Sequence, residues 1–206
     1  VRKKNKSLPK IETVIPKLNT EVTKEEVVEI AKGYQFAMDN YDFTAAGSDL
    51  VFEDYKVDEK INHIDGITVE EAEHMMATKL YQNNAKVHFN HFVEKGGRFG
   101  KRIVYGGHVI SLTRSISFNG LSNAFKVIAI NGGTHASPCF AGKTVFAWSK
   151  IIEKVDVSDT LGALRIRTNG LGDAQPYQFQ HQDQNGKFNS DVLLSLDYWA
   201  LVPKKK

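Results

Sequence analysis

Four strand-like stretches follow one another in the C-terminal part of the chain, with no helical pattern between them. They are rich in β-branched and aromatic residues, and they cover residues 124–130, 144–155, 162–168 and 192–202. Turn residues separate them, as Asn131-Gly-Gly133, Gly142-Lys143 and Asn169-Gly-Leu-Gly172. Because parallel neighbours would need long crossover connections, usually helices, this order predicts an antiparallel sheet rather than a βαβ pattern.

A short apolar segment ahead of those strands opens with two glycines. Gly106 and Gly107 precede a run with few charges, whose apolar positions are Val109, Ile110, Leu112 and Ile116. This pattern predicts a helix that is buried on most sides, with Gly120 as its C-terminal stop. One buried helix followed by an antiparallel run predicts an α+β fold, in which a curved antiparallel sheet wraps around a central helix.

Two capping boxes predict further helices earlier in the chain. Thr23-Lys-Glu-Glu26 precedes the apolar positions Val27, Ile30, Ala31, Tyr34 and Met38, which have helical spacing. Thr68-Val-Glu-Glu71 opens a second predicted helix, which places Val69, Ala72, Met76 and Leu80 on one face and should end near residues 81–84. Between the boxes we expect an irregular segment over 42–54 and a strand over 55–63, and after them an exposed loop over 93–101.

Length and composition indicate one globular domain. The chain has 206 residues, of which 41% are apolar and 25% charged. Residues 1–22 are basic and contain Pro9 and Pro16, so we expect a linker there and a domain over 23–206 with an N-terminal helical extension. The excess of Lys and Arg sits at the two ends and indicates solvated termini rather than a nucleic-acid partner. Cys139 is the only cysteine, which excludes an intrachain disulfide and favours a buried thiol in a reducing compartment.

Neither a signal peptide nor a membrane span is evident in the sequence. No early apolar region precedes a cleavage-like site, and no apolar run reaches the length that crosses a bilayer. The expectation is therefore a cytoplasmic protein without a membrane partner.

Several stretches resemble the MaoC-like enoyl-CoA hydratases, a family with the hot-dog fold. In that family a helix ends with Asp, four further residues and His; here Asn83 and His88 stand at these positions. Tyr105-Gly-Gly-His108 is similar to the family's glycine segment before the central helix, and Pro138–Thr144 is similar to its turn into a long strand. Within the family, residues 65–74, 80–90, 97–112, 117–121 and 162–168 most resemble the C-terminal half of the mesaconyl-CoA hydratase (β-methylmalyl-CoA dehydratase) group.

The resemblance implies a hydro-lyase that adds water to an α,β-unsaturated acyl-CoA, most specifically mesaconyl-CoA. Such a reaction needs a base for the attacking water and stabilisation of charge on the thioester oxygen. Histidine exchanges protons near neutral pH, so His88 is the expected acid/base, unless it is only a hydrogen-bonded residue at a helix end. Asn83 would orient the water through its amide, unless it only terminates the helix. Glu73 is either a charge partner of His88 or an exposed helix residue.

Substrate-binding roles are assigned by the same resemblance. The N–H groups of Gly106 and Gly107 would stabilise the oxyanion at a helix N-terminus, although a tight turn also needs glycine. His108 would touch the substrate. A cation should recognise the substrate carboxylate or the CoA phosphates, and the candidates are Arg98, Lys101, Arg102 and Arg114. No metal and no cofactor are expected, since coenzyme A is part of the substrate.

Two alternative functions remain open at this level. An acyl-CoA thioesterase has the same fold, but its site usually holds a carboxylate where Asn83 stands. The second alternative is a non-catalytic half that binds acyl-CoA or has a structural role and needs a partner hot-dog chain. Either function agrees with a homodimer or with pairing to a second hot-dog domain.

Overall fold

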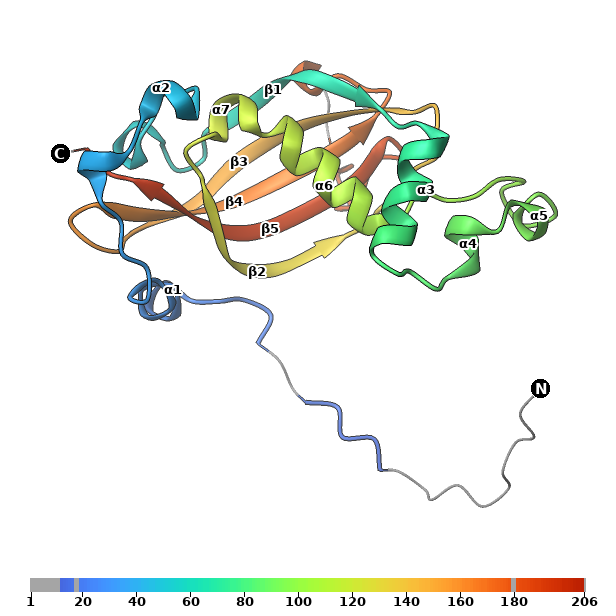
Figure 1. Cartoon of the computed structure of the whole chain (residues 1–206), viewed down its shortest axis with the longest axis horizontal. Helices are drawn as coiled ribbons and strands as arrows, with labels where there is room; N and C mark the ends of the chain where they lie inside the picture. Colours follow the sequence, from blue (N-terminus) through green and yellow to red (C-terminus); the bar gives the residue numbers. More distant parts are fainter. Residues whose placement is uncertain (1–11, 17–18, 179–180, 206) are drawn as a thin grey trace.

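The computed structural model describes residues 12–16, 19–178 and 181–205. Most of the predicted linker over 1–22 therefore lies outside the described residues. Five strands form one antiparallel sheet in the order β1-β3-β4-β5-β2 (Figure 1). Their bounds are β1 Lys60–Thr68, β2 Lys126–Thr134, β3 Thr144–Asp156, β4 Leu161–Gly172 and β5 Val192–Pro203.

The helix α6 (Gly106–Ile116) lies across one face of this sheet and packs on β1, β3, β4 and β5 (Figure 1). Its buried residues include Val109, Leu112 and Ile116, which join the main core. A Cβ on Gly170 of β4 would lie 2.5 Å from Thr113 Oγ1, so this glycine allows the close approach of helix and sheet. The predicted arrangement of a curved antiparallel sheet around one buried helix is confirmed.

The short helix α1 (Lys24–Ala31) packs on part of the opposite face of the sheet, near β2 (Figure 1). Its predicted capping box is present, because Thr23 Oγ1 accepts from Glu26 N at 3.2 Å and Glu26 Oε2 accepts from Thr23 N at 2.8 Å. Val27 and Ala31 are buried against the sheet. The helix is shorter than its apolar spacing predicted. Ile30 lies within it but is exposed, Tyr34 lies beyond its end at Ala31, and Met38 lies in the separate 3₁₀ turn η1 (Met38–Asn40).

The remaining helices are short. They are α2 Phe43–Ala46, η2 Phe52–Asp54, α3 Glu71–Leu80, α4 Lys86–Phe89, α5 His91–Glu94, α7 Phe118–Leu121 and η3 Pro176–Gln178. Two of them, α3 and α7, contact α6. The segment 42–54 is thus less irregular than predicted, and the predicted loop over 93–101 begins inside α5. The helix α6 ends at Ile116, before the predicted stop; Gly120, with φ of 101°, lies in α7. None of the helices in the described part of the chain is long and apolar enough to span a bilayer.

Three predicted boundaries in the sheet are wrong. The strand expected over 55–63 begins at Lys60, because Asp58 takes a left-handed turn conformation with φ of 69°. The two turns expected at 131–133 and 169–172 lie inside β2 and β4. Asn169 is fully buried there and Asn131 Nδ2 donates to Asp197 Oδ1 at 2.8 Å, so both residues belong to the packed sheet.

The predicted start and face of α3 are also wrong. Thr68 is not an N-cap; it pairs with Thr144 in the sheet, and Glu70 caps the helix. Of the expected apolar face, Met76 and Leu80 are 62% and 71% exposed. The buried face instead consists of His74, Ala77 and Thr78. The inward side of this helix carries polar residues and its apolar residues face outward. The apolar pattern therefore predicted the wrong face as the buried one.

A chain of hydrogen bonds crosses the core from β1 to α6. His63 and Ser149 are fully buried, as are Thr168 and Tyr198. The Asn119 carbonyl can only accept, so His63 Nδ1 donates to it at 2.6 Å, and His63 Nε2 accepts from Ser149 at 2.8 Å. The further steps are Thr168 to Ser149 at 2.8 Å, Tyr198 to Thr168 at 3.1 Å and Arg114 to Tyr198 at 2.5 Å. A neutral His63 gives this chain one consistent direction.

The neutral state of His63 predicts a pH-dependent stability. Burial lowers the pKa of His63, whereas the unfolded imidazole binds a proton near its ordinary pKa of about 6.5. The unfolded state therefore holds more protons just below that pH, and the free energy of unfolding falls as the pH drops through this window. In His63→Gln the free energy of unfolding, measured by urea unfolding, should fall less than in the parent as the pH drops through this window. The other histidines are the same in both proteins, so the difference between the two pH slopes reports His63. Identical pH slopes would contradict this.

Candidate active site

His88 is fixed by the segment that leads into α6. Its Nδ1 donates to the Ile103 carbonyl at 2.9 Å, and the Ile103 N–H donates back to the Val87 carbonyl at 3.1 Å. The same segment is tied to the turn before β3, since Val104 N donates to the Cys139 carbonyl at 2.9 Å. A carbonyl can only accept, so the proton of neutral His88 resides on Nδ1 and Nε2 keeps its lone pair. This is the tautomer that a general base needs.

The N-terminus of α6 lies beside His88. Tyr105 occupies the N-cap position without a side-chain cap, and its ring meets the His88 ring at a centroid distance of 5.8 Å. A Cβ on Gly107 would lie 2.7 Å from the Tyr105 hydroxyl oxygen, so only glycine lets this ring fold over the helix start. The first N–H groups of a helix have no partner inside it. Such N–H groups and the helix dipole favour a developing negative charge, and the oxyanion role of Gly106 and Gly107 stays a prediction.

Asn83 follows α3 and holds a tight turn. Its Oδ1 accepts from Ala85 N at 2.9 Å, which fixes the orientation of the amide group, because only the oxygen can accept. The Nδ2 group is then left to donate. Asn83 therefore stabilises the turn after α3 through its oxygen. Its Nδ2 group can in addition donate to a water molecule.

His108 faces α3. Its Nε2 lies 3.5 Å from Glu73 Oε1, and only 8% of the residue is exposed. Glu73 therefore lies beside His108, whereas the sequence left open a charge partner of His88 or an exposed helix residue. The fully buried His74, whose pKa is lowered by burial, bonds Glu71 Oε2 at 3.2 Å. This polar network supports the contact of α3 with α6.

The four predicted cationic residues do not form one cluster. Arg98 lies over the Phe99 ring at 5.0 Å and Lys101 over the Phe140 ring at 4.3 Å, and these two aromatic rings pack edge to face. Arg102 bonds Glu71 Oε2. Arg114 is near the other end of α6 and lines a separate cavity. The loop before α6 therefore holds three of the candidates, and Arg114 is remote from them.

Sequence reasoning missed His135, which follows β2 and lies against the start of α6. Its Nε2 is 2.7 Å from where a Cβ on Gly106 would be. Partial burial lowers the pKa of His135, which favours a neutral imidazole. No local pattern marks this residue, because β2 and α7 separate it from Gly106 in the sequence. Tyr105 precedes the two glycines in the sequence, but the sequence does not show that its ring contacts His88 and Gly107.

Two remaining expectations concern Cys139 and metal ions. Cys139 is buried, and burial raises the pKa of its thiol to about 11, in agreement with a structural thiol. Within the described residues, no group of three or more His, Cys, Asp or Glu side chains is arranged to hold a metal ion.

Comparison with known proteins shows similarity along the whole chain. No protein-family model matches the sequence. The chain is 48% identical over 207 residues to a β-methylmalyl-CoA dehydratase of Chloroflexus aurantiacus, and 48% identical over 206 residues to a mesaconyl-CoA hydratase of Cereibacter sphaeroides. These alignments cover 100% and 99% of this chain but 58% of each relative. The chain thus spans little more than half the length of the curated relatives it matches.

Solved structures give the same result for the fold. A MaoC domain protein dehydratase from Chloroflexus aurantiacus aligns with a TM-score of 0.87 at 48% identity, over 100% of this chain and 58% of that chain. A Mycobacterium tuberculosis protein with a double hot-dog fold aligns with a TM-score of 0.56 at 18% identity, over 79% of this chain and 44% of that one. The chain therefore has the hot-dog fold, and over its whole length it is a relative of part of the β-methylmalyl-CoA dehydratase and mesaconyl-CoA hydratase proteins.

Proposed function

We propose that this chain is the catalytic hot-dog domain of a hydro-lyase that reversibly adds water to mesaconyl-CoA, giving β-methylmalyl-CoA. The observation that carries the proposal is the fixed tautomer of His88, with Nε2 free beside the glycine-opened start of α6. The names of the two relatives at 48% identity support this substrate. The two names describe the activity of longer proteins, and the proposal assigns that activity to the single domain formed by this chain.

The reaction balances with the residues of this site. His88 Nε2 takes a proton from water while the water oxygen attacks Cβ of the unsaturated thioester. The electron pair of the double bond moves toward the thioester oxygen, where the N–H groups of Gly106 and Gly107 stabilise it. Protonated His88 then returns a proton at Cα and becomes neutral again. No electron is gained or lost overall, so the hydration requires no redox cofactor, and coenzyme A enters as part of the substrate.

Asn83 is proposed to hold the attacking water through its Nδ2 group. Asn83→Asp preserves the acceptor for Ala85 N, whereas Asn83→Ala removes both this acceptor and the donor. We expect Asn83→Ala to lower kcat by about tenfold to a hundredfold, the effect of ~1.4–2.7 kcal/mol on the barrier. Asn83→Asp should fold as the parent does and separate the turn role from water binding. If both variants turn over at the parental rate, Asn83 has only its turn role.

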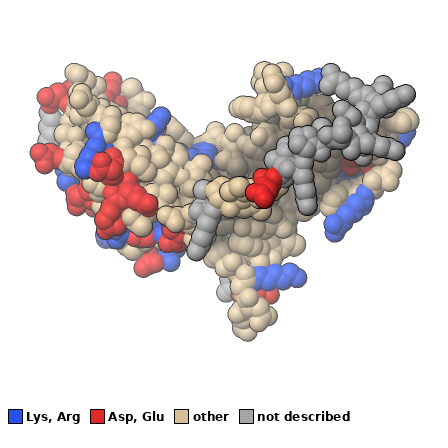
Figure 2. Space-filling model, turned by 90° about the horizontal axis from the view of Figure 1, so that it is seen from below, with Lys and Arg blue, Asp and Glu red and all other residues tan. Residues whose placement is uncertain are grey.

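The loop before α6 is proposed to recognise the anionic parts of the substrate. Arg98 and Lys101 stack on an aromatic pair and project from an exposed segment, whereas Arg102 is engaged by Glu71. Seen from below, acidic side chains gather toward the end of the molecule that holds the C-terminus, and the opposite end shows few of them (Figure 2). Exposed cations in such surroundings suit the CoA phosphates. Among the predicted candidates, Arg98 and Lys101 are therefore the best placed for the nucleotide end of the substrate.

A second hot-dog unit is the proposed partner. Apolar side chains near His88 are exposed on α3 and α5, among them Leu80 at 71% and Phe92 at 79%. Exposed apolar side chains grouped in this way are typical of interaction sites. The relatives are longer than this chain, which supports a partner domain or a second copy at this surface.

A spectrophotometric assay of the purified chain with mesaconyl-CoA tests the proposal. Hydration should lower the enoyl-thioester absorbance without releasing free thiol. Thiol release would instead show a thioesterase. A folded chain that is inactive alone but active after addition of the missing part of a relative would show that the site needs its partner. No turnover in either condition would contradict the proposed reaction.

A further inference from the structure

His135 lies against the start of α6, and the hydration proposed above makes no use of it. It directly follows β2, which ends beside that helix (Figure 1). A Cβ on Gly106 would lie 2.7 Å from His135 Nε2 and 2.9 Å from its Cε1. Because a carbon–carbon single bond is about 1.5 Å long, Nε2 lies within about 4.2 Å of Gly106 Cα. The imidazole therefore borders the place proposed for the thioester oxygen.

The backbone on the C-terminal side of His135 is anchored at two points. The N–H of the next residue donates to the Leu193 carbonyl of β5 at 3.1 Å. Farther along, the Cys139 carbonyl accepts from Val104 N at 2.9 Å. Val104 belongs to the segment before α6 to which His88 is also bonded. Both histidines are thus attached to the short stretch of chain that leads into the helix.

The imidazole of His135 is accessible and has no partner. The residue is exposed, and in the described part of the chain neither ring nitrogen forms a hydrogen bond. Partial burial lowers the pKa of His135, which favours the neutral ring with one N–H donor. An approaching carboxylate favours the second proton and gives a charge-assisted hydrogen bond. This side chain therefore suits an anionic group of the substrate.

The free carboxylate of mesaconyl-CoA must lie near the start of α6 if the substrate binds as proposed. It is attached to Cβ, the carbon that the water attacks. Three bonds separate its carbon atom from the thioester carbon, a distance of at most about 4 Å. A thioester oxygen at the N–H groups of Gly106 and Gly107 therefore brings the carboxylate within reach of the side chains around this end of the helix.

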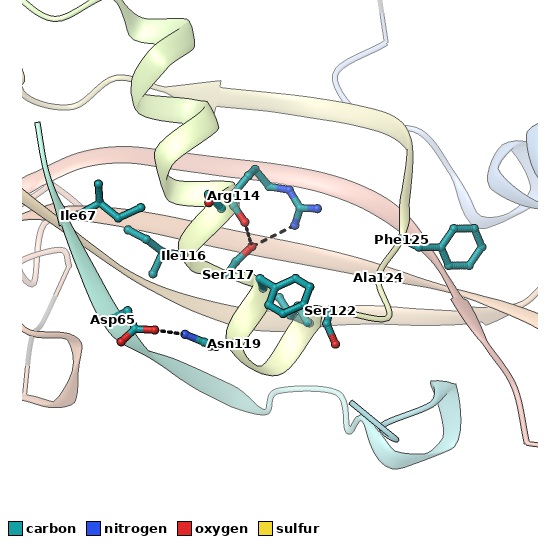
Figure 3. Close-up of a pocket in the computed structure, with 12 residues that line it drawn as sticks. Asp65, Ile67, Arg114, Ile116, Ser117, Asn119, Ser122, Ala124 and Phe125 are labelled. Carbon is teal, nitrogen blue, oxygen red and sulfur yellow. Dashed lines mark hydrogen bonds between the residues drawn. The ribbon is translucent and has the colours of Figure 1, made fainter. Parts of the chain in front are cut away.

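Arg114 is too far away to bind this carboxylate. It lies eight residues after Gly106, which corresponds to about 12 Å along α6 at ~1.5 Å per residue. Its guanidinium lies over the Tyr198 ring at 4.7 Å and donates to Ser117 Oγ at 3.2 Å, beside a separate cavity of about 600 Å³ (Figure 3). The length of the helix thus separates this arginine from the reacting atoms.

The nearer cationic side chains have other partners. Arg102 bonds Glu71 Oε2, and His108 Nε2 lies 3.5 Å from Glu73 Oε1. The two cations that stack on the aromatic pair of the loop are proposed for the CoA phosphates. Beside Gly106, the imidazole of His135 is therefore the side chain with a free donor for the carboxylate.

We propose that His135 binds the free carboxylate of mesaconyl-CoA and gives the site its preference for an acyl group with a second carboxyl. This role of His135 rests on the proposed function, because it requires the thioester to lie at the start of α6. An acyl group with a methyl in place of the carboxylate leaves the imidazole without a partner.

Two saturated thioesters, which cannot be hydrated, test this role separately from the reaction. Succinyl-CoA carries the free carboxylate, and butyryl-CoA carries a methyl in its place. Calorimetry with the whole chain should show binding at least about tenfold tighter for succinyl-CoA, the usual effect of a hydrogen bond to a charged group. His135→Phe keeps a ring but no donor, and should reduce this ratio to about twofold or less by weakening succinyl-CoA.

Two further variants serve as references for His135→Phe. His135→Gln keeps a donor and should retain part of the preference. His181→Phe is the matched control, because its ring packs on Trp148, outside the core that α6 joins, and it should leave both dissociation constants unchanged. Circular dichroism checks that each variant is folded.

The role of His135 is overturned if the parent does not bind succinyl-CoA more tightly than butyryl-CoA, or if folded His135→Phe keeps the parental ratio. Loss of the preference in Tyr105→Phe alone would assign the carboxylate to the tyrosine hydroxyl instead. Hydration of mesaconyl-CoA is measured independently. A chain that prefers succinyl-CoA through His135 but does not hydrate mesaconyl-CoA would contradict the proposed reaction and retain the carboxylate site.

Discussion

His88→Gln is expected to lower kcat for the hydration of mesaconyl-CoA by about 10²–10⁴-fold while the protein stays folded. Glutamine can still donate to the Ile103 carbonyl, so the connection between α4 and the start of α6 is retained. It cannot accept the proton of the attacking water, and the base is lost. Because the proposed role lies in the transition state rather than in binding, KM should change much less than kcat.

His91→Gln is the matched control for this variant. His91 begins α5, three residues after His88, and it is exposed. Its replacement should leave kcat within about twofold of the parent, a difference of only ~0.4 kcal/mol in the barrier. Stopped-flow absorbance at the enoyl-thioester band measures both variants, and circular dichroism checks that both are folded. A folded His88→Gln protein with parental kcat would remove His88 from the mechanism.

The central helix and its glycine start were predictable because the signals are local. A run with few charges that opens with Gly106 and Gly107 predicts a buried helix, and α6 begins there. The family resemblance identified His88 and Asn83 as candidate site residues. It did not predict the hydrogen bonds that hold them. The bond from His88 to Ile103 joins residues on two separate segments, and no periodic pattern reports such a contact.

The errors share a physical cause, which is burial of polar or flexible residues. The inward side of α3 carries His74 and Thr78, so the hydrophobic pattern pointed to its exposed side. Asn169 and Gly170 suggested a turn, but both lie inside β4. Gly170 is small because Thr113 of α6 packs closely against it. Tertiary packing thus overrode local preference. Arg165 is a further example, since nothing in the sequence shows that this arginine is buried.

Arg165→Met is expected to lower the free energy of unfolding by about 3–5 kcal/mol, the usual effect of breaking a buried ion pair. Arg165 is 6% exposed on β4. It bonds Asp197 through two nitrogens, both at 2.9 Å, and also Glu153 and Glu21, each at 2.7 Å. Methionine leaves Asp197 charged and mostly enclosed without its main partner. Urea unfolding near neutral pH measures the loss.

Arg167→Met separates this network from a general loss of positive charge. Arg167 makes one bond to Asp197, at 3.1 Å, and its side chain is 43% exposed, so its removal should cost no more than about 1 kcal/mol. The double variant Arg165→Met with Asp197→Leu removes the unpaired carboxylate and should recover part of the lost stability. Equal losses for the two arginine variants would show that burial of Arg165 does not set its contribution.

The pH dependence of the Arg165 variant distinguishes a lost ion pair from lost packing. Burial alone would raise the pKa of Asp197, but hydrogen bonds from Arg165, Asn131 and Arg167 hold that pKa below its usual range. A carboxyl with a depressed pKa stabilises the fold above its unfolded pKa of about 3.9, and this contribution disappears as the pH falls through the folded value. The parent loses this contribution in acid, whereas Arg165→Met has already lost it. The stability difference between the two should therefore narrow as the pH falls below about 4. A difference that is constant with pH would assign the effect to packing of the arginine stem.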